Sequence, residues 1–370
     1  MDEATVRNQK RTELNLERQL HRKAEIDINR TGLGEMLQEA QEIENITSQE
    51  IKGLASRIKR RKHADAKDLL KLSYGFQQSA ENISVFLRIT GSINVIVKAL
   101  TGQSSELQEL AGECLCNLTL GDEVCCEKVA TFAGTYLITF LENLNNQQIN
   151  STCIWTLQNI ISSGVKSMKV LSSQGIVARF IHLLSETGND LLYTEILLAI
   201  DLILEYKFDF ISKDLVLVQL LPIISSKKPQ LNSLKVLYKC LFLIRFETLH
   251  QNTLIQVTNH CIESFAATLR QMSHTTRCAE TVLAVRILAN LVATNEAPYS
   301  NMLLSESQQR NVELANLFNA NSEAGHIQIC REFLWLFGNL HIAANQLQLE
   351  HIELANLLQN LNVPEVLVCC

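Results

Sequence analysis

The chain's two tryptophans stand at the same spacing to an asparagine. They occur in IWTLQN (154–159) and LWLFGN (334–339), with Trp155 four residues before Asn159 and Trp335 four residues before Asn339. Positions i and i+4 of an α-helix lie on one face, about one turn apart. An asparagine amide can pair with a peptide backbone, and an indole can stack on the stem of a lysine or arginine. Such a pair could therefore hold part of an extended basic peptide.

The frame that carries these pairs recurs along the chain. Its last position falls, in successive units, at Asn117, Asn159, Asp201, Arg245, Asn290 and Asn339, with spacings of 42, 42, 44, 45 and 49 residues. A second landmark, a glycine before an amphipathic run, falls at Gly91, Gly134 and Gly175, 43 and 41 residues apart. Each glycine predicts a sharp turn before a helix. Repeats of this length are typical of α-solenoids with two or three helices per unit.

The composition supports an all-α chain. Among 370 residues there are only 4 prolines and 14 glycines, and 46% are hydrophobic. A sheet protein would need more turn residues. We therefore predict about seven repeats from near residue 45 to near residue 361. The apolar segment 191–206 is too short for a membrane span and predicts a buried helix. The polar stretch 305–325 predicts a longer loop.

Several function classes are disfavoured by the sequence. The net charge of −6 gives no general reason to expect nucleic-acid binding. The cysteines number 11, are scattered, and follow an N-terminus without a secretory signal, which fits free thiols in a reducing compartment. Neither CLC (114–116) nor CC (125–126) has C-x-x-C spacing, so no metal or cofactor is expected. Common catalytic motifs are absent, and the pattern favours a binding protein over an enzyme.

The repeat sequence resembles a known family. The stretch WTLQNIISSGVKSMKVLSSQGIVARFIHLL (155–184) resembles an armadillo repeat of the importin-α type, in which W-x-x-x-N closes the third helix. The runs LRITGSINVIVKAL (87–100), TYLITFLENL (135–144) and QGIVARFI (174–181) look most like a divergent branch of that family named for transmembrane and coiled-coil domains. The resemblance implies a right-handed superhelical armadillo/HEAT-type solenoid over residues 45–370.

The resemblance also implies a binding site on the third helices. Equivalent positions of stacked repeats form a ladder along a concave groove, and the implied ligand is a basic nuclear localisation signal. The predicted groove residues are Asn117, Trp155, Asn159, Asp201, Asn290, Trp335 and Asn339. In the alternative interpretation, the tryptophans belong to the core and the asparagines bond to neighbouring repeats without a ligand.

Charged residues at ladder positions modify this prediction. Asp201 takes an asparagine position and could attract a lysine. Arg245 and Arg286 stand in the middle of the array and would repel a cationic peptide. The prediction is a groove with two permissive ends and a repulsive centre, unless both arginines are solvated or ion-paired.

We predict a separate N-terminal helical extension over residues 1–44, whose basic residues lie within 7–30. At about 100° per residue, Arg7, Arg11, Arg18 and Arg22 share one stripe of a helix, flanked by Lys10 and Lys23. This resembles the segment of importin-α that binds importin-β, which makes importin-β a candidate partner. Within residues 1–30, six acidic residues nearly balance seven basic ones, so a solvated helical extension is the alternative.

The densest basic run is RIKRRK (57–62). It could serve as a localisation signal or as a second partner site. The alternative is an exposed face of the first repeat.

Two functions remain open at this point. The first is an importin-α-like adapter, found in cytoplasm and nucleus, that binds basic localisation peptides for protein import. The second is an armadillo scaffold for protein–protein interaction with no transport role. A preference for lysine- and arginine-rich extended peptides would separate them.

Overall fold

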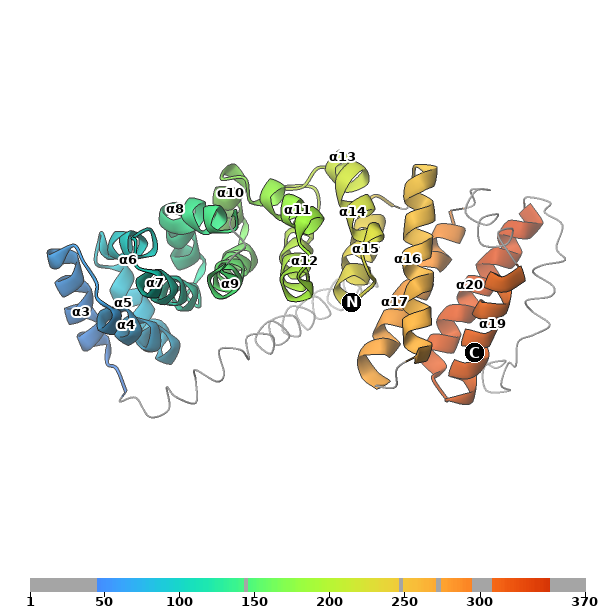
Figure 1. The fold of residues 1–370 in the computed structure, drawn as a ribbon, viewed down its shortest axis with the longest axis horizontal. Helices are drawn as coiled ribbons and strands as arrows, with labels where there is room; N and C mark the ends of the chain where they lie inside the picture. Colours follow the sequence, from blue (N-terminus) through green and yellow to red (C-terminus); the bar gives the residue numbers. More distant parts are fainter. Residues whose placement is uncertain (1–44, 143–145, 246–248, 271–273, 295–307, 347–370) are drawn as a thin grey trace, which may run out of the picture.

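The computed structural model describes residues 45–142, 146–245, 249–270, 274–294 and 308–346. Within these ranges all regular secondary structure is helical (Figure 1). The N-terminal extension, with its predicted importin-β contacts, lies outside the described residues. The described part begins at the predicted start of the solenoid.

The units are held together by a row of helices that we call the third helices. These are α4 (Ala66–Gln78), α7 (Ser105–Leu118), α9 (Gln147–Ser163), α12 (Asp190–Leu204), α15 (Leu231–Leu243), α17 (His274–Val292) and α20 (Ile327–Gln346). Each packs against the third helix of the next unit. The described chain is therefore an all-α solenoid of seven stacked units, and the predicted fold class is confirmed.

The remaining helices form an outer layer. They are α3 (Ser48–Arg61), α5 (Ala80–Leu87), α6 (Ser92–Leu100), α8 (Glu123–Phe140), α10 (Val165–Ser173), α11 (Ile176–Glu186), α13 (Lys213–Leu215), α14 (Leu221–Ser226), α16 (Gln251–Arg270) and α19 (Gln308–Glu323), with a π-helical turn at Val216–Leu220. Figure 1 shows an arch with α8, α10, α11 and α13 on its outer side and α7, α9 and α12 on its inner side. The apolar core lies between the two layers, with Phe86, Phe180 and Phe318 fully buried.

The glycine landmarks have two different roles. Gly91 and Gly175 adopt left-handed backbone conformations, with φ of 87° and 86°, directly before α6 and α11. The predicted turn is confirmed at both. Gly134 instead lies inside α8, so the prediction of a turn there is wrong. A Cβ at Gly134 would collide with Gln174 and Leu171, which indicates that this glycine permits close packing between α8 and the neighbouring unit.

The predicted loop over 305–325 is also wrong where the structure describes it. Residues 308–323 form α19, in which Leu314 and Phe318 are buried one turn apart. The polar residues between them had obscured this apolar stripe. The apolar segment 191–206 falls on α12, as predicted for a helix.

No single helix among the described residues has both the length and the apolar character needed to cross a membrane. Helices α5 and α6 meet that test only as a pair, with a bend of 98° between them.

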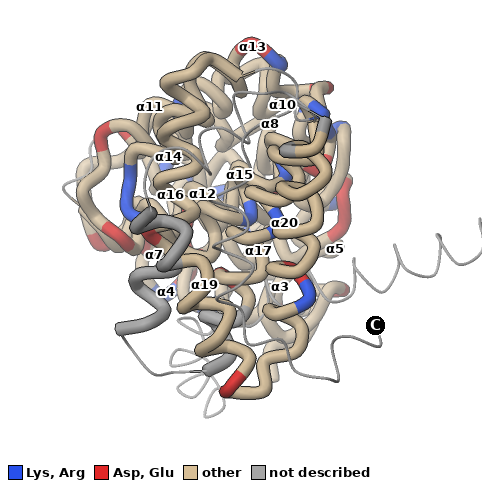
Figure 2. Tube along the Cα trace, turned by 90° about the vertical axis from the view of Figure 1, so that its right-hand side faces the viewer, with Lys and Arg blue, Asp and Glu red and all other residues tan. Residues whose placement is uncertain are grey.

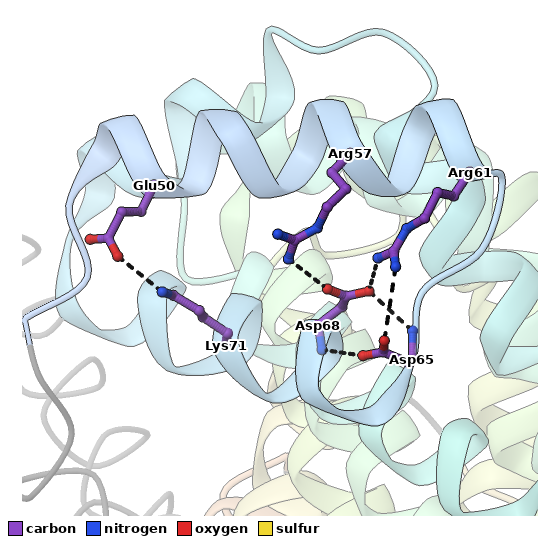
Figure 3. Close-up of polar contacts among 6 residues, drawn as sticks. All are labelled: Glu50, Arg57, Arg61, Asp65, Asp68 and Lys71. Atoms are coloured by element: carbon purple, nitrogen blue, oxygen red, sulfur yellow. Dashed lines mark hydrogen bonds and ion pairs between the residues drawn. The ribbon is translucent and has the colours of Figure 1, made fainter.

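The first unit is a two-helix hairpin of α3 and α4 closed by ion pairs (Figure 3). Asp68 of α4 is buried and receives Arg57 Nη2 at 2.9 Å and the guanidinium of Arg61. At the other end of the hairpin, Lys71 Nζ lies 2.9 Å from Glu50 Oε1. Burial alone would raise the pKa of Asp68, but the hydrogen bond from Arg57 and its other polar contacts hold it below its usual value.

These ion pairs bear on the basic run 57–62. Two of its cations, Arg57 and Arg61, neutralise a buried carboxylate, and residues 48–61 are helical. An extended localisation signal would require α3 to unfold, which would break both ion pairs to Asp68 and expose apolar residues of α3 such as Ile51 and Ile58 to water. The run therefore lies on the exposed face of a folded helix of the first repeat, as in the alternative interpretation, and its role as a second partner site stays a prediction.

Candidate peptide-binding surface

Each third helix leaves one accessible stripe, and together these stripes form what we call the inner face. On α9 most of the side chains are buried, while Gln148, Ser151 and Trp155 remain at least partly accessible. On α15 the corresponding stripe contains Tyr238 and Phe242. Side chains at i, i+3 and i+4 share a helical face, so the third-helix row presents one side to the outer layer and leaves the other side accessible.

The asparagines beside Trp155 lie deeper than predicted. Asn159 is 5% exposed, and its Nδ2 donates to Thr119 Oγ1 at 3.0 Å. Asn117 is 2% exposed, and its Nδ2 donates to Ser73 Oγ at 2.7 Å. Each thus bonds to the unit before it, and little of either amide is left for a ligand on the inner face. Their role as peptide clamps stays a prediction.

Trp155 is half-buried on α9, a helix that packs against α7 of the preceding unit and α12 of the following unit. Its indole lies against Glu195 of α12, and its Nε1–H has no hydrogen-bond partner of normal geometry within the described residues. Gln158 Nε2 donates to Glu195 Oε2 at 3.2 Å. In α7 of the preceding unit, Glu113 takes the position that Trp155 takes in α9. We call Glu109, Glu113, Trp155 and Glu195 the acidic site.

The carboxylates of the acidic site are partly dehydrated. Burial raises the pKa of Glu113, and the nearby charge of Glu109 raises it further. Burial also raises the pKa of Glu195, although Gln158 and Trp155 act in the opposite direction. Glu109 accepts a hydrogen bond from Asn146 Nδ2 at 3.0 Å. No lysine or arginine among the described residues forms an ion pair with these three carboxylates, so the site is suited to an external cation.

The centre of the inner face is neutralised by internal ion pairs. Lys239 Nζ lies 2.5 Å from Asp201 Oδ1 and 2.7 Å from Glu205 Oε1. Asp201 is therefore already occupied by a lysine of its own chain. Arg286 forms a two-pronged ion pair with Glu332, with Nε 3.1 Å from Oε2. The hydrogen bond to Glu332 raises the pKa of Arg286.

The predicted repulsive centre is not what the structure shows. Arg286 is ion-paired, and Arg245 lies beyond the end of α15 in a left-handed conformation with φ of 59°. The sequence prediction placed Arg245 within a third helix, but in the structure the helix of this unit ends at Leu243 and Arg245 lies in the loop that follows it. The centre is close to neutral, as in the ion-paired alternative.

The far end of the inner face is more open. Trp335 of α20 is 44% exposed. Asn339 Nδ2 donates to the Ala289 carbonyl oxygen of α17 at 2.9 Å, and Asn290 Nδ2 donates to the Arg286 carbonyl oxygen of its own helix at 2.9 Å. Both asparagines are only half-buried, so part of each amide remains accessible.

The sequence reasoning missed three accessible residues of α15. These are Tyr238, Lys239 and Phe242. Lys239 lies two repeat lengths of 42 residues after Trp155. Counting a constant repeat of 42 residues from Trp155 would therefore have predicted which residues of α15 are accessible, whereas the spacings that grow along the chain did not.

Away from the inner face, the buried cysteines and the buried His260 lie in the interior of the fold. The described cysteines are buried, and burial raises the pKa of Cys153 to about 12, which leaves an inert thiol. His260 of α16 is buried, with Nδ1 3.1 Å from the Lys227 carbonyl oxygen and Nε2 3.0 Å from Ser233 Oγ. Burial lowers its pKa to about 4. Figure 2, a view along the solenoid, shows charges of both signs distributed around the molecule.

Comparisons with known proteins bear on the architecture. No protein-family model matches the sequence. Among solved structures, the chain is similar to an engineered protein, with 16% identity over 79% of this chain and 78% of that chain and a TM-score of 0.48. It is also similar to a designed armadillo repeat protein in complex with the peptide (KR)4, with 15% identity over 79% and 99% of the two chains and a TM-score of 0.40.

A third similar structure is the SYS-1/POP-1 complex, with 11% identity over 74% of this chain and 57% of that chain and a TM-score of 0.45. None of these three similarities reaches a TM-score of 0.5 or 25% identity, and they do not show what this chain binds. The function must therefore be argued from the residues of this chain.

Proposed function

We propose that the inner face binds an extended, lysine- or arginine-bearing segment of another protein, and that the chain acts as an importin-α-like adapter for import of such proteins into the nucleus. The observation that carries the proposal is the acidic site, where the half-buried indole lies against Glu195 and Glu113 takes the equivalent position one repeat earlier, with no ion-paired lysine or arginine among the described residues. Residence in both cytoplasm and nucleus is part of the proposal.

The chemistry of the acidic site favours a cation. Burial of Glu113 and Glu195 disfavours their charged forms, and an ammonium or guanidinium group placed beside them would offset that penalty. The ring of Trp155 can cover the methylene stem of the same side chain, and a cation at about 6 Å from an indole gains roughly 0.5–2 kcal/mol. Because Asn117 and Asn159 are largely committed to neighbouring repeats, we expect weaker binding than a full ladder would give.

The first experiment measures peptide binding. Fluorescence anisotropy of a labelled lysine-rich peptide with the full chain should give saturable binding that an acidic peptide of equal length lacks. Combining Glu113→Gln with Glu195→Gln should weaken binding about thirtyfold, since each lost charge-assisted contact contributes roughly 1 kcal/mol and the two together roughly 2 kcal/mol. Glu81→Gln, at an exposed glutamate of α5, is the matched control. Equal binding of basic and acidic peptides would overturn the proposal.

The second experiment tests the transport role. If the arginine stripe of residues 7–22 binds importin-β, the full chain should capture importin-β from solution. Replacing Arg7, Arg11, Arg18 and Arg22 by glutamate, with Lys10 and Lys23 left in place, should abolish capture without changing the melting temperature. Absence of capture by the parent chain would exclude the adapter role.

The second candidate function is a scaffold that holds a protein partner without taking part in transport. The burial of Asn117 and Asn159 favours it, because those side chains serve the contact between repeats. A scaffold of this kind should bind its partner with no preference for lysine- or arginine-rich segments, so the peptide measurement separates the two functions.

A further inference from the structure

We infer that the inner face recognises its partner at a second position, where Tyr238 and Phe242 of α15 accept one large apolar side chain of the same extended segment. That apolar residue would stand about five or six residues away from the cation held at the acidic site. The inference rests on the proposed function for the first contact, while the second contact is additional to it.

The aromatic pair is accessible and preorganised. Tyr238 and Phe242 lie one turn apart on α15, with ring centroids 6.4 Å apart and planes 24° from parallel. Phe242 is 63% exposed, which makes it one of the most exposed large apolar residues of the described chain. Leaving such a ring in water is unfavourable, and covering it with another apolar group removes that cost. A pair of stacked rings therefore offers a firm apolar platform.

The charges around this platform nearly cancel and offer a second cation no net attraction. Lys239 and Arg286 are satisfied by carboxylates of their own chain and would gain little from a ligand. Lys235, on the same stripe of α15, adds a positive charge with no ion-pair partner among the described residues. Because Lys239 faces two carboxylates, Asp201 and Glu205, the charge of Lys235 only balances the negative charge that remains. A second lysine would therefore gain no net attraction here, whereas an aromatic or aliphatic side chain would cover the two rings. The second position therefore differs in chemistry from the acidic site.

The spacing follows from the row of third helices. Trp155 is on α9 and Phe242 is on α15, with only α12 between them in the row. Packed helices lie roughly 8–10 Å apart, so two steps along the row cover roughly 16–20 Å. An extended chain advances about 3.3 Å per residue, and about five or six residues span that distance. A single extended segment can thus reach both positions.

The outer layer provides a matched control. Phe132 and Tyr136 are also one turn apart, on α8, and both are exposed. They lie in the outer layer and not in the third-helix row (Figure 1). If exposed aromatic pairs bound apolar groups without regard to place, this pair would serve as well as Tyr238 and Phe242.

The test uses the full chain and labelled synthetic peptides. Each peptide carries two adjacent lysines in a serine-rich background, with one phenylalanine placed between two and ten residues away on either side, or with none. Anisotropy titrations should show a maximum in affinity at a separation of about five or six residues, about tenfold above the peptide without phenylalanine. Phe242→Ala and Phe242→Lys should each remove this gain, and Phe132→Ala should preserve it.

Two outcomes would overturn the inference. If the lysine peptides bind through Trp155 but gain nothing from phenylalanine at any separation, or gain equally in Phe242→Ala, the second position is wrong and the proposed function stands. If no lysine peptide binds at all, the proposed function fails and this inference fails with it. Melting temperatures of both Phe242 variants should match that of the parent, because an exposed ring contributes little to the core.

Discussion

The same W-x-x-x-N motif occupies two sites whose surroundings differ. In α9, Trp155 is half-buried beside Glu195, and Asn159 is buried against the preceding unit. In α20, Trp335 is largely exposed, and Asn339 keeps part of its amide accessible. The motif therefore specifies only which side chains share a helical face. The residues that adjacent repeats bring to that face decide what the motif can do.

The charge pattern differs in the same way. The acidic site around Trp155 has carboxylates without cations among the described residues, whereas Glu332, three residues before Trp335 on α20, is paired with Arg286. A lysine of a partner would thus meet unpaired charge at one end of the inner face and a satisfied ion pair towards the other. We expect the Trp155 end to be the stronger site for cations.

The largest expected effect is on stability at the two tryptophans. Trp155→Ala should lower the free energy of unfolding by about 3 kcal/mol, because it opens space between α9 and its neighbours. Trp335→Ala should lower it by less than about 1 kcal/mol, since nearly half of that side chain is already in water. Urea unfolding followed by circular dichroism measures both. Equal losses would show that the two sites are alike.

A second comparison uses pH. His260 is buried near the C-terminal half with its pKa lowered to about 4, against about 6.5 in an unfolded chain. Since the unfolded state binds the proton more readily between those values, His260 contributes stability above pH 6.5 that is lost as pH falls towards 4. The loss should amount to about 2–3 kcal/mol.

The two tryptophans allow this acid effect to be located. In a Trp155→Phe variant, Trp335 reports on the C-terminal half, and in a Trp335→Phe variant, Trp155 reports on the other half. We expect the Trp335 fluorescence to change first on acidification to pH 4.5. His260→Gln should make the two fluorescence signals change at the same pH. If Trp335 still changed first in that variant, another titrating group would be the cause.

A smaller effect is expected at the asparagines. Asn159→Ala should cost about 1–2 kcal/mol of stability, because it leaves the buried hydroxyl of Thr119 without the amide that now donates to it. Asn339→Ala should cost less, since water can replace the amide at the half-buried Ala289 contact. If Asn159→Ala were neutral in unfolding but weakened a lysine peptide, the predicted clamp role would be supported instead.

The smallest effect concerns Glu113. Because burial raises its pKa, the protonated form is favoured in the folded chain, and its contribution to stability is present at acid pH and lost as pH rises above about 4.5. Glu113→Gln should therefore slightly raise the urea midpoint at pH 7 while weakening the lysine peptide. Glu81→Gln should change neither. A lower midpoint for Glu113→Gln would indicate that this carboxylate has a structural partner.

Local sequence patterns predicted the structure correctly where the conformation depends on one residue and not on contacts with another repeat. Gly91 and Gly175 were correctly placed before helices because a left-handed residue needs only its own backbone freedom. Gly134 was not, because its role depends on Gln174 and Leu171 from a neighbouring unit. The repeat alignment also placed Arg245 within a third helix and so missed the accessible residues of α15. A loop that is longer or shorter by a few residues shifts the alignment of the next helix, and the apolar pattern of that helix does not reveal the shift.

By itself, the sequence determined that the chain is a solenoid of helical units about 42 residues apart. A single repeat cannot bury its own apolar face, so that face must pack against the neighbouring repeats. It also determined that each tryptophan shares a helical face with an asparagine. Only the tertiary structure decided that Asn117 and Asn159 are buried, that Lys239 occupies Asp201, and that Glu332 neutralises Arg286. Burial and ion pairing at these positions depend on side chains about 40 residues apart, whose distance is set by the packing of one repeat on the next.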